Sequence, residues 1–120
     1  MAQVLLMAAR PNVGYNLRAS GRGQLMLVGR RYLISGRVKG VGFRFFTCEA
    51  ASREGIAGFV RNLPDRRVEV VAEGEADAMS RFEAVIRQGP IGARVDDVET
   101  DVVPAAGRYD GFSVTGWAAD

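Results

Sequence analysis

A glycine-rich loop is the stretch of this sequence best suited to chemistry. It runs from Gly36 to Arg44, between a short β-prone run and the start of a helical pattern. Such a loop can turn several backbone N–H groups toward one point, and with the positive end of the following helix dipole they form an anion site of phosphate size. Arg44 adds a planar fork of donors for two phosphate oxygens. The alternative is a tight turn beside a solvated Arg44, since no Walker pattern or full dinucleotide fingerprint is present.

Asn62 is the second candidate. It stands near the end of a β-rich run, just before Pro64 and Asp65, where asparagine is usually a turn former. Its carboxamide carries both a donor and an acceptor, so it could hold a water in line with a bound phosphorus without transferring a proton. Spacing does not decide between these two roles.

The amino-acid composition excludes several other kinds of catalytic and metal site. The chain has 120 residues, which suits one domain, and it contains no histidine, which excludes histidine triads and the commonest zinc ligand. Cys48 is the only cysteine, so an internal disulfide is impossible. We expect a packed rather than nucleophilic Cys48, no metal site and a cytoplasmic location.

The distribution of charge and the hydropathy of the chain limit the classes of partner that it is expected to bind. Residues 1–25 hold three of the 16 basic residues and none of the 14 acidic ones, so the remainder of the chain is close to neutral. Because nucleic-acid binding usually requires a basic folded surface, it is not expected here. No apolar run approaches the roughly 18 residues that cross a bilayer, so no membrane partner is expected. We interpret residues 1–28 as a flexible N-terminal extension, in preference to a transit peptide, and residues 29–118 as the folded domain.

Hydrophobic periodicity predicts an alternation of strands and helices. The expected elements are strands at 31–35, 56–63, 67–73, around 95–103 and at 112–117, and helices at 44–54 and 75–88. This order is typical of the split βαβ pattern. The predicted fold is an α+β sandwich, with an antiparallel sheet and two helices on one face.

Several dispersed motifs together resemble the acylphosphatase family. The glycine loop Gly36–Arg44 is followed by the run Gly55–Asn62, and further matching positions occur in the same order. They are Pro64-Asp65, Val68-Glu69-Val70, Glu73-Gly74 and Gly89-Pro90. The resemblance covers roughly residues 30 to 117. One departure is Arg66, which stands where the family often has glycine after the turn aspartate.

The resemblance implies a ferredoxin-like fold, an enzyme that hydrolyses the carboxyl–phosphate bond, and no metal or organic cofactor. It makes Arg44 the catalytic, phosphate-binding arginine and Asn62 the residue that positions water. The implied phosphate cradle comprises Gly36, Arg37, Val38, Lys39, Gly40, Val41, Gly42, Phe43 and Arg44. The expected partners are a small acyl phosphate and inorganic phosphate as the product ligand, bound by a monomer. The carboxylate leaving group departs without protonation, so the lack of histidine costs little.

Two other functions compete with this interpretation. The stretch from Lys39 to Phe46 resembles an RNA-recognition signature, but here it follows the first strand and opens a helix, whereas that signature lies within a sheet strand. The fold could also serve as a regulatory or carbamoyl-phosphate-handling module, or as an interaction protein with an idle site. A protein whose stability does not change when phosphate is added would favour the interaction protein with an idle site.

Overall fold

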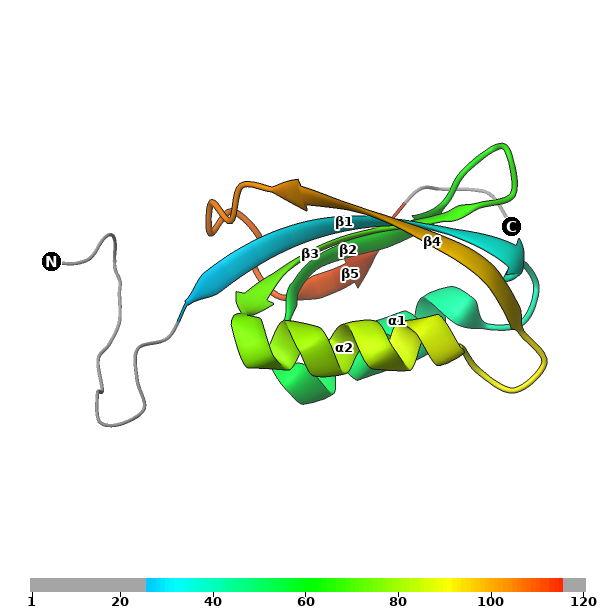
Figure 1. Ribbon diagram of the computed structural model, residues 1–120, viewed down its shortest axis with the longest axis horizontal. Helices are drawn as coiled ribbons and strands as arrows, with labels where there is room; N and C mark the ends of the chain where they lie inside the picture. Colours follow the sequence, from blue (N-terminus) through cyan, green and yellow to red (C-terminus); the bar gives the residue numbers. More distant parts are fainter. Residues whose placement is uncertain (1–25, 116–120) are drawn as a thin grey trace, which may run out of the picture.

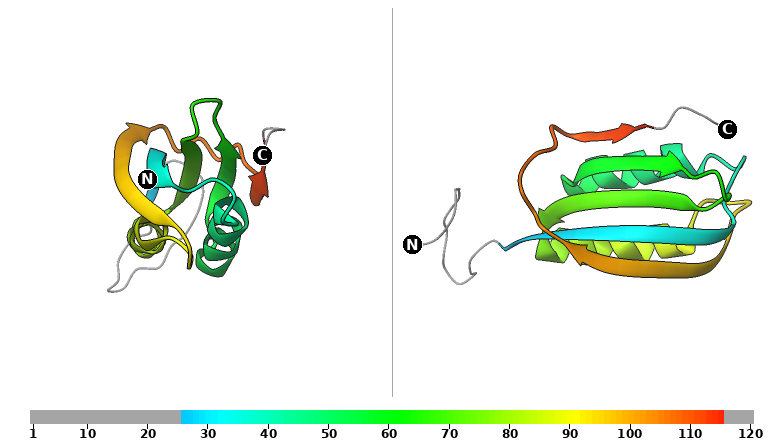
Figure 2. Two further views of the ribbon diagram at one scale, coloured as in Figure 1. Left: turned by 90° about the vertical axis from the view of Figure 1, so that its right-hand side faces the viewer. Right: turned by 90° about the horizontal axis from the view of Figure 1, so that it is seen from above.

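The structure is a computed structural model that describes residues 26–115, and it forms one sheet with two helices on one face (Figure 1). The elements in chain order are β1 (Leu27–Arg37), α1 (Phe43–Glu54), β2 (Ala57–Asn62), β3 (Val68–Glu75), α2 (Ala76–Gln88), β4 (Arg94–Val103) and β5 (Phe112–Val114). The views from the end and from above show both helices beneath the same face of the sheet (Figure 2). The predicted α+β sandwich is therefore confirmed. Neither helix is long and apolar enough to cross a membrane, and the described residues contain no other.

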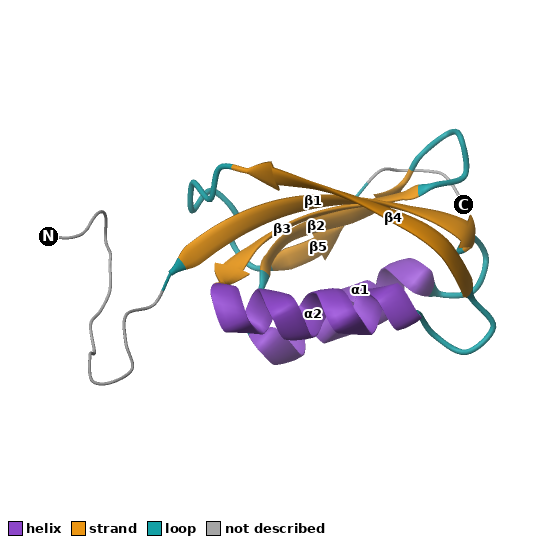
Figure 3. Ribbon diagram, in the orientation of Figure 1, coloured by secondary structure: helices purple, strands orange, loops and turns teal. Residues whose placement is uncertain are grey.

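The strand order is β4-β1-β3-β2-β5. The pairs β4–β1, β1–β3 and β3–β2 are antiparallel, but β5 is parallel to β2, so the expectation of an antiparallel sheet is wrong for the fifth strand. The cause is the path of the chain after β4. Strand β4 ends opposite the start of β1, where Val103 pairs with Gly29, and the connection crosses to the other edge at that end of the sheet (Figure 3). Strand β5 must then run in the direction of β2.

Strand β1 is longer at both ends than the predicted 31–35. It lies between β3 and β4, and it pairs with β3 from Leu27 onward, so the sheet begins two residues before the domain start expected at 29. Residues 1–25, which make up most of the predicted extension, lie outside the described part of the chain. So do residues 116 and 117, the last two of the predicted final strand.

The core lies between the sheet and the helices. Alternate residues of β3, namely Val68, Val70 and Ala72, are fully buried, as the two-residue period of a strand requires for one face. They meet the apolar stripe of α2, where Phe82 and Ile86 are also fully buried. This packing fixes the helices against the strands, and so fixes where α1 begins relative to the strand ends.

The turn between β2 and β3 tolerates an arginine in a conformation that glycine favours. Arg66 has φ 77°, the one positive value for a residue other than glycine in the described chain. Its N–H donates to the Leu63 carbonyl at 3.0 Å, while the Leu63 N–H donates to the Arg67 carbonyl at 2.8 Å. The Asp65 carboxylate accepts the Arg67 N–H at 3.1 Å, which further fixes the turn. The backbone thus keeps the left-handed geometry despite the side chain.

Arg66→Gly is expected to raise the free energy of unfolding by about 0.5–1 kcal/mol. Glycine relieves the strain of an L side chain in the left-handed conformation, and this gain exceeds the cost of the larger backbone entropy that glycine has in the unfolded chain. Urea denaturation of both proteins measures the change. A loss of stability would contradict this and would show that the arginine side chain makes a compensating contact.

Candidate active site

The sheet topology brings the predicted site residues to one end of the molecule. Strands β1 and β2 are each antiparallel to β3, so they run parallel to one another and their carboxyl ends share one end of the sheet. The glycine loop follows β1, Asn62 is the last residue of β2, and α1 begins at the same end (Figure 3). The loop, Arg44 and Asn62 therefore all lie at one end of the sheet.

The register places Asn62 relative to β1 and to the helices. Asn62 pairs with Val68 of β3, which pairs in turn with Ile34 of β1. Since neighbouring strands lie about 4.8 Å apart, Asn62 is about 10 Å from Ile34 across β3. Alternation places Asn62 on the same face as Val60, which is fully buried under the helices. Asn62 thus belongs to the face on which α1 lies.

Two glycines give the loop its shape. Gly40 and Gly42 both have φ 77°, in the left-handed region where an L side chain is strained. A Cβ at either position would meet no atom within 4 Å, so backbone conformation rather than lack of space favours glycine there. Left-handed residues in such loops turn successive N–H groups toward a common point, which is a recurrent anion-binding geometry.

The start of α1 is electrostatically suited to an anion. Gly42 is its N-cap residue, no side chain caps the helix, and the first turn contains no acidic residue. The positive end of the helix dipole is therefore not neutralised by an acid of its own first turn. Arg44, the second residue of α1, is half-buried at this terminus, and Asn62, the last residue of β2, is also half-buried.

The two ends of the predicted cradle lie in the elements that flank the loop. Gly36 and Arg37 belong to β1 rather than to the loop. A Cβ on Gly36 would lie 2.1 Å from the carbonyl oxygen of Arg94, so glycine there lets β4 approach. Val38 and Phe43 are 1% and 2% exposed, respectively, which leaves their backbone rather than their side chains available to a ligand. Residues 38–42 thus form the loop between β1 and α1, and the buried side chains of Val38 and Phe43 anchor it in the core at its two ends.

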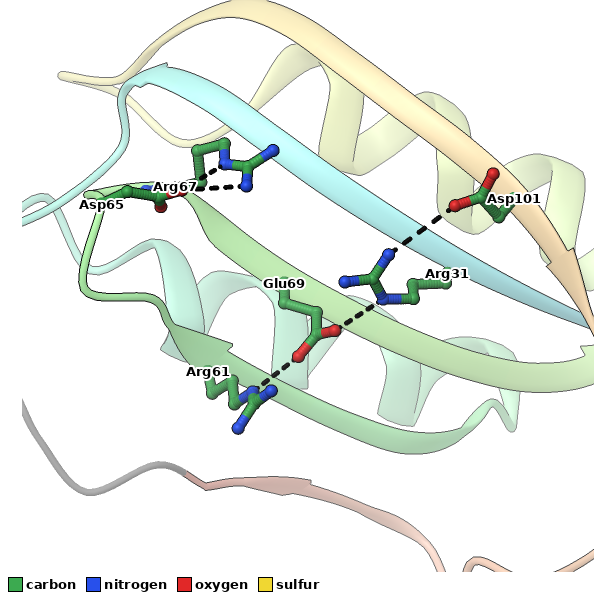
Figure 4. Close-up of polar contacts among 6 residues, drawn as sticks. All are labelled: Arg31, Arg61, Asp65, Arg67, Glu69 and Asp101. Atoms are coloured by element: carbon green, nitrogen blue, oxygen red, sulfur yellow. Dashed lines mark hydrogen bonds and ion pairs between the residues drawn. The ribbon is translucent and has the colours of Figure 1, made fainter.

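The face of the sheet away from the helices carries an ion-pair network that sequence reasoning missed (Figure 4). The Glu69 carboxylate accepts hydrogen bonds from Arg31 Nε at 2.6 Å and from Arg61 Nε at 2.5 Å, and Arg31 also lies 3.6 Å from a carboxylate oxygen of Asp101. Burial alone would raise the pKa of Glu69, but the hydrogen bonds and charges of the two arginines outweigh burial and lower it. The pairing of Arg61 with Glu69 could have been anticipated from the hairpin register about residues 64–66.

Cys48 packs against the fifth strand. It is half-buried, its thiol donates a long hydrogen bond of 3.8 Å to the Phe112 carbonyl, and burial raises the pKa of the thiol. These features fit the packing role predicted for it. Within residues 26–115, no three Cys, Asp or Glu side chains gather in a group that could hold a metal ion.

Comparison with known proteins agrees with this geometry. The sequence model of the acylphosphatase family matches residues 30–114. An acylphosphatase of Rubrobacter xylanophilus is 51% identical over 84 residues, which are 70% of this chain and 76% of that protein. One from Syntrophobacter fumaroxidans is 49% identical over 82 residues, with 68% and 84% of the two chains covered. The crystal structure of acylphosphatase from Bacillus subtilis superposes with a TM-score of 0.72 at 34% identity, covering 76% of this chain and all of that one.

The sheet topology and the loop ahead of α1 define a ferredoxin-like α+β domain. At one end of its sheet, the loop and the start of α1 are suited to binding an anion. Within that class, the extent of the family match and the identity to named relatives are decisive: the chain belongs to the acylphosphatase family.

Proposed function

We propose that Arg44 and the backbone of residues 36–44 bind the phosphoryl group of an acyl phosphate, and that Asn62 positions the attacking water. The reaction is that of the family: water cleaves the carboxyl–phosphate bond and gives a carboxylate and inorganic phosphate. One observation supports the assignment most strongly. The loop, the start of α1 and the end of β2 meet at one end of the sheet although they are far apart in sequence.

The chemistry requires little beyond charge and position. In the transition state, negative charge is spread over the phosphoryl oxygens, and a guanidinium with converging N–H groups stabilises it. The bond to the acyl oxygen breaks and its electron pair leaves on a carboxylate, a weak base that needs no general acid. The protons of the attacking water pass to the phosphate product and the solvent. Arg44 and the loop thus supply the stabilisation, and we infer that neither a metal nor an organic cofactor takes part.

Asn62 suits the second role because of its chemistry and its place. Its carboxamide can accept a hydrogen bond from the water and donate another, so it can fix the direction of attack without exchanging a proton. It lies in a strand that is paired with β3, and this pairing sets the side-chain position better than an irregular loop would.

The remaining properties follow from this function. We infer a cytoplasmic monomer whose catalytic unit is the domain expected over 29–118, with its first strand β1 starting two residues earlier, at Leu27. Its substrate is a small acyl phosphate, inorganic phosphate is its product ligand, and it has no nucleic acid or membrane partner. The RNA-recognition alternative is disfavoured because its aromatic positions lie in α1, where Phe43 is buried and its ring centroid is 6.0 Å from that of Phe46. Such aromatics cannot form a stacking surface on the sheet.

The fate of labelled oxygen tests this mechanism. Hydrolysis of benzoyl phosphate by the metal-depleted protein in isotopically labelled water is expected to put the label into inorganic phosphate, because the water held by Asn62 attacks phosphorus. Mass spectrometry of both products measures this. Label in benzoate would mean attack on the carbonyl carbon and would contradict the role given to Asn62.

A further inference from the structure

Asn62 is linked through its neighbour to the far face of the sheet. Adjacent residues of a strand point to opposite faces, so Arg61 lies on the face away from the helices while Asn62 belongs to the helix-covered one. The Arg61 guanidinium donates to Glu69 of β3 at 2.5 Å, directly across the hairpin (Figure 4). A rotation of β2 that moved Asn62 would therefore stretch this bond.

The end of β2 is paired with a neighbouring strand on one side. Its pairing with β5 runs from Gly58 to Val60, whose carbonyl accepts the Thr115 N–H at 2.9 Å. Its pairing with β3 continues to Asn62. Beyond Val60, then, β3 is the one hydrogen-bonded strand neighbour of β2 in the described chain. A strand end flanked on one side twists more readily than one flanked on both, so a side-chain link there matters more.

Glu69 is a firm anchor for that link. Its side chain is 5% exposed, and each carboxylate oxygen accepts one charge-assisted hydrogen bond, the second from Arg31 of β1. Both arginines are partly exposed, but removing one of them would leave the buried carboxylate with less compensation for its charge, which makes the link costly to break. The Glu69 carboxylate of β3 therefore connects β2 to β3 and to β1.

We propose that Glu69 is a positioning residue for the reaction: through Arg61 it sets the orientation of β2 at Asn62, and hence the place of the attacking water. The inference rests on the role proposed for Asn62. Phosphate binding should depend much less on Glu69, because β1, which leads into the loop, is paired on one side with β3 and on the other with β4.

Glu69→Gln tests the proposal, because glutamine keeps the size of the side chain but loses one acceptor oxygen and the charge. We expect kcat for benzoyl phosphate to fall about tenfold, since small displacements of a reacting group are costly, while KM and the Kd of inorganic phosphate stay within about twofold. Unchanged kcat, or a loss confined to KM and phosphate affinity, would overturn it.

Glu73→Gln is the matched control. Glu73 is the other buried carboxylate of β3 on the same face, 6% exposed, and accepts hydrogen bonds from the Ala106 and Gly107 N–H groups at 2.9 and 3.0 Å. It pairs with Ala57, at the end of β2 remote from Asn62. Both variants are expected to lose stability, but only Glu69→Gln should lose kcat. Equal losses of kcat would show a general structural effect and overturn the proposal.

The Asn62→Ala background separates this proposal from the function on which it rests. If Glu69 acts through Asn62, adding Glu69→Gln to Asn62→Ala lowers kcat no further, whereas a multiplicative loss contradicts the proposal. A fully active Asn62→Ala would refute the role of Asn62 itself and the positioning role with it. An impaired Asn62→Ala beside a fully active Glu69→Gln would refute the positioning role alone. Should Glu69→Gln fail to fold, Arg61→Gln cuts the same link and leaves Glu69 paired with Arg31, with the same expected tenfold fall in kcat.

Discussion

Arg44→Ala is expected to lower kcat/KM for benzoyl phosphate by more than about a hundredfold, which corresponds to roughly 3 kcal/mol of transition-state stabilisation. The guanidinium is proposed to make charge-assisted hydrogen bonds to the phosphoryl oxygens at the start of α1, where the loop N–H groups also converge. Its loss should weaken both the binding of phosphate and the stabilisation of charge in the transition state. Steady-state hydrolysis and the Kd of inorganic phosphate measure the two effects.

The matched control is Arg53→Ala, which removes an exposed arginine from the last turn of the same helix. It changes the net charge by the same amount but lies at the opposite end of α1, so kcat/KM should remain within about twofold of the wild-type value. Arg44→Lys refines the test, because lysine keeps the charge but not the planar fork and should recover only part of the activity. Wild-type activity in Arg44→Ala would refute the assignment.

Asn62→Ala is expected to lower kcat by about a hundredfold while the Kd of inorganic phosphate changes by less than about twofold, because the side chain is proposed to touch the water rather than the phosphate. The free energy of unfolding, measured in parallel, shows whether the strand end survives the substitution. A large loss of phosphate affinity would instead place Asn62 among the phosphate-binding groups. Arg44→Ala is thus expected to lower both phosphate affinity and turnover, whereas Asn62→Ala is expected to lower turnover alone.

The elements around the site could be predicted because local signals mark their ends. Gly42 and Gly55 bound α1, both in the left-handed conformation, and the Pro64-Asp65 pair marks the hairpin between β2 and β3. The resemblance to acylphosphatases then supplied roles for Arg44 and Asn62 that spacing alone left open. Those roles stay predictions, whereas the placement of both residues at one end of the sheet is observed.

Other features depend on partners distant in sequence and could not be predicted. The charged residues near the ends of β1, such as Arg30 and Arg37, obscured its full length, which is determined by pairing with β3 and β4 on either side. The parallel direction of β5 follows from the path of its connection across the sheet end, where Glu73 accepts two N–H groups. The link between Arg61 and Glu69 is an exception, because the register of the hairpin about residues 64–66 would have placed the two residues opposite each other.

The most direct test of the central claim is the initial rate of benzoyl phosphate hydrolysis in a metal chelator, measured side by side for the wild type, Arg44→Ala and Asn62→Ala. The account predicts rapid release of benzoate and inorganic phosphate by the wild type, unaffected by the chelator, and losses of about a hundredfold or more in both variants. A folded wild type that releases neither product, or variants that match it, would contradict the account.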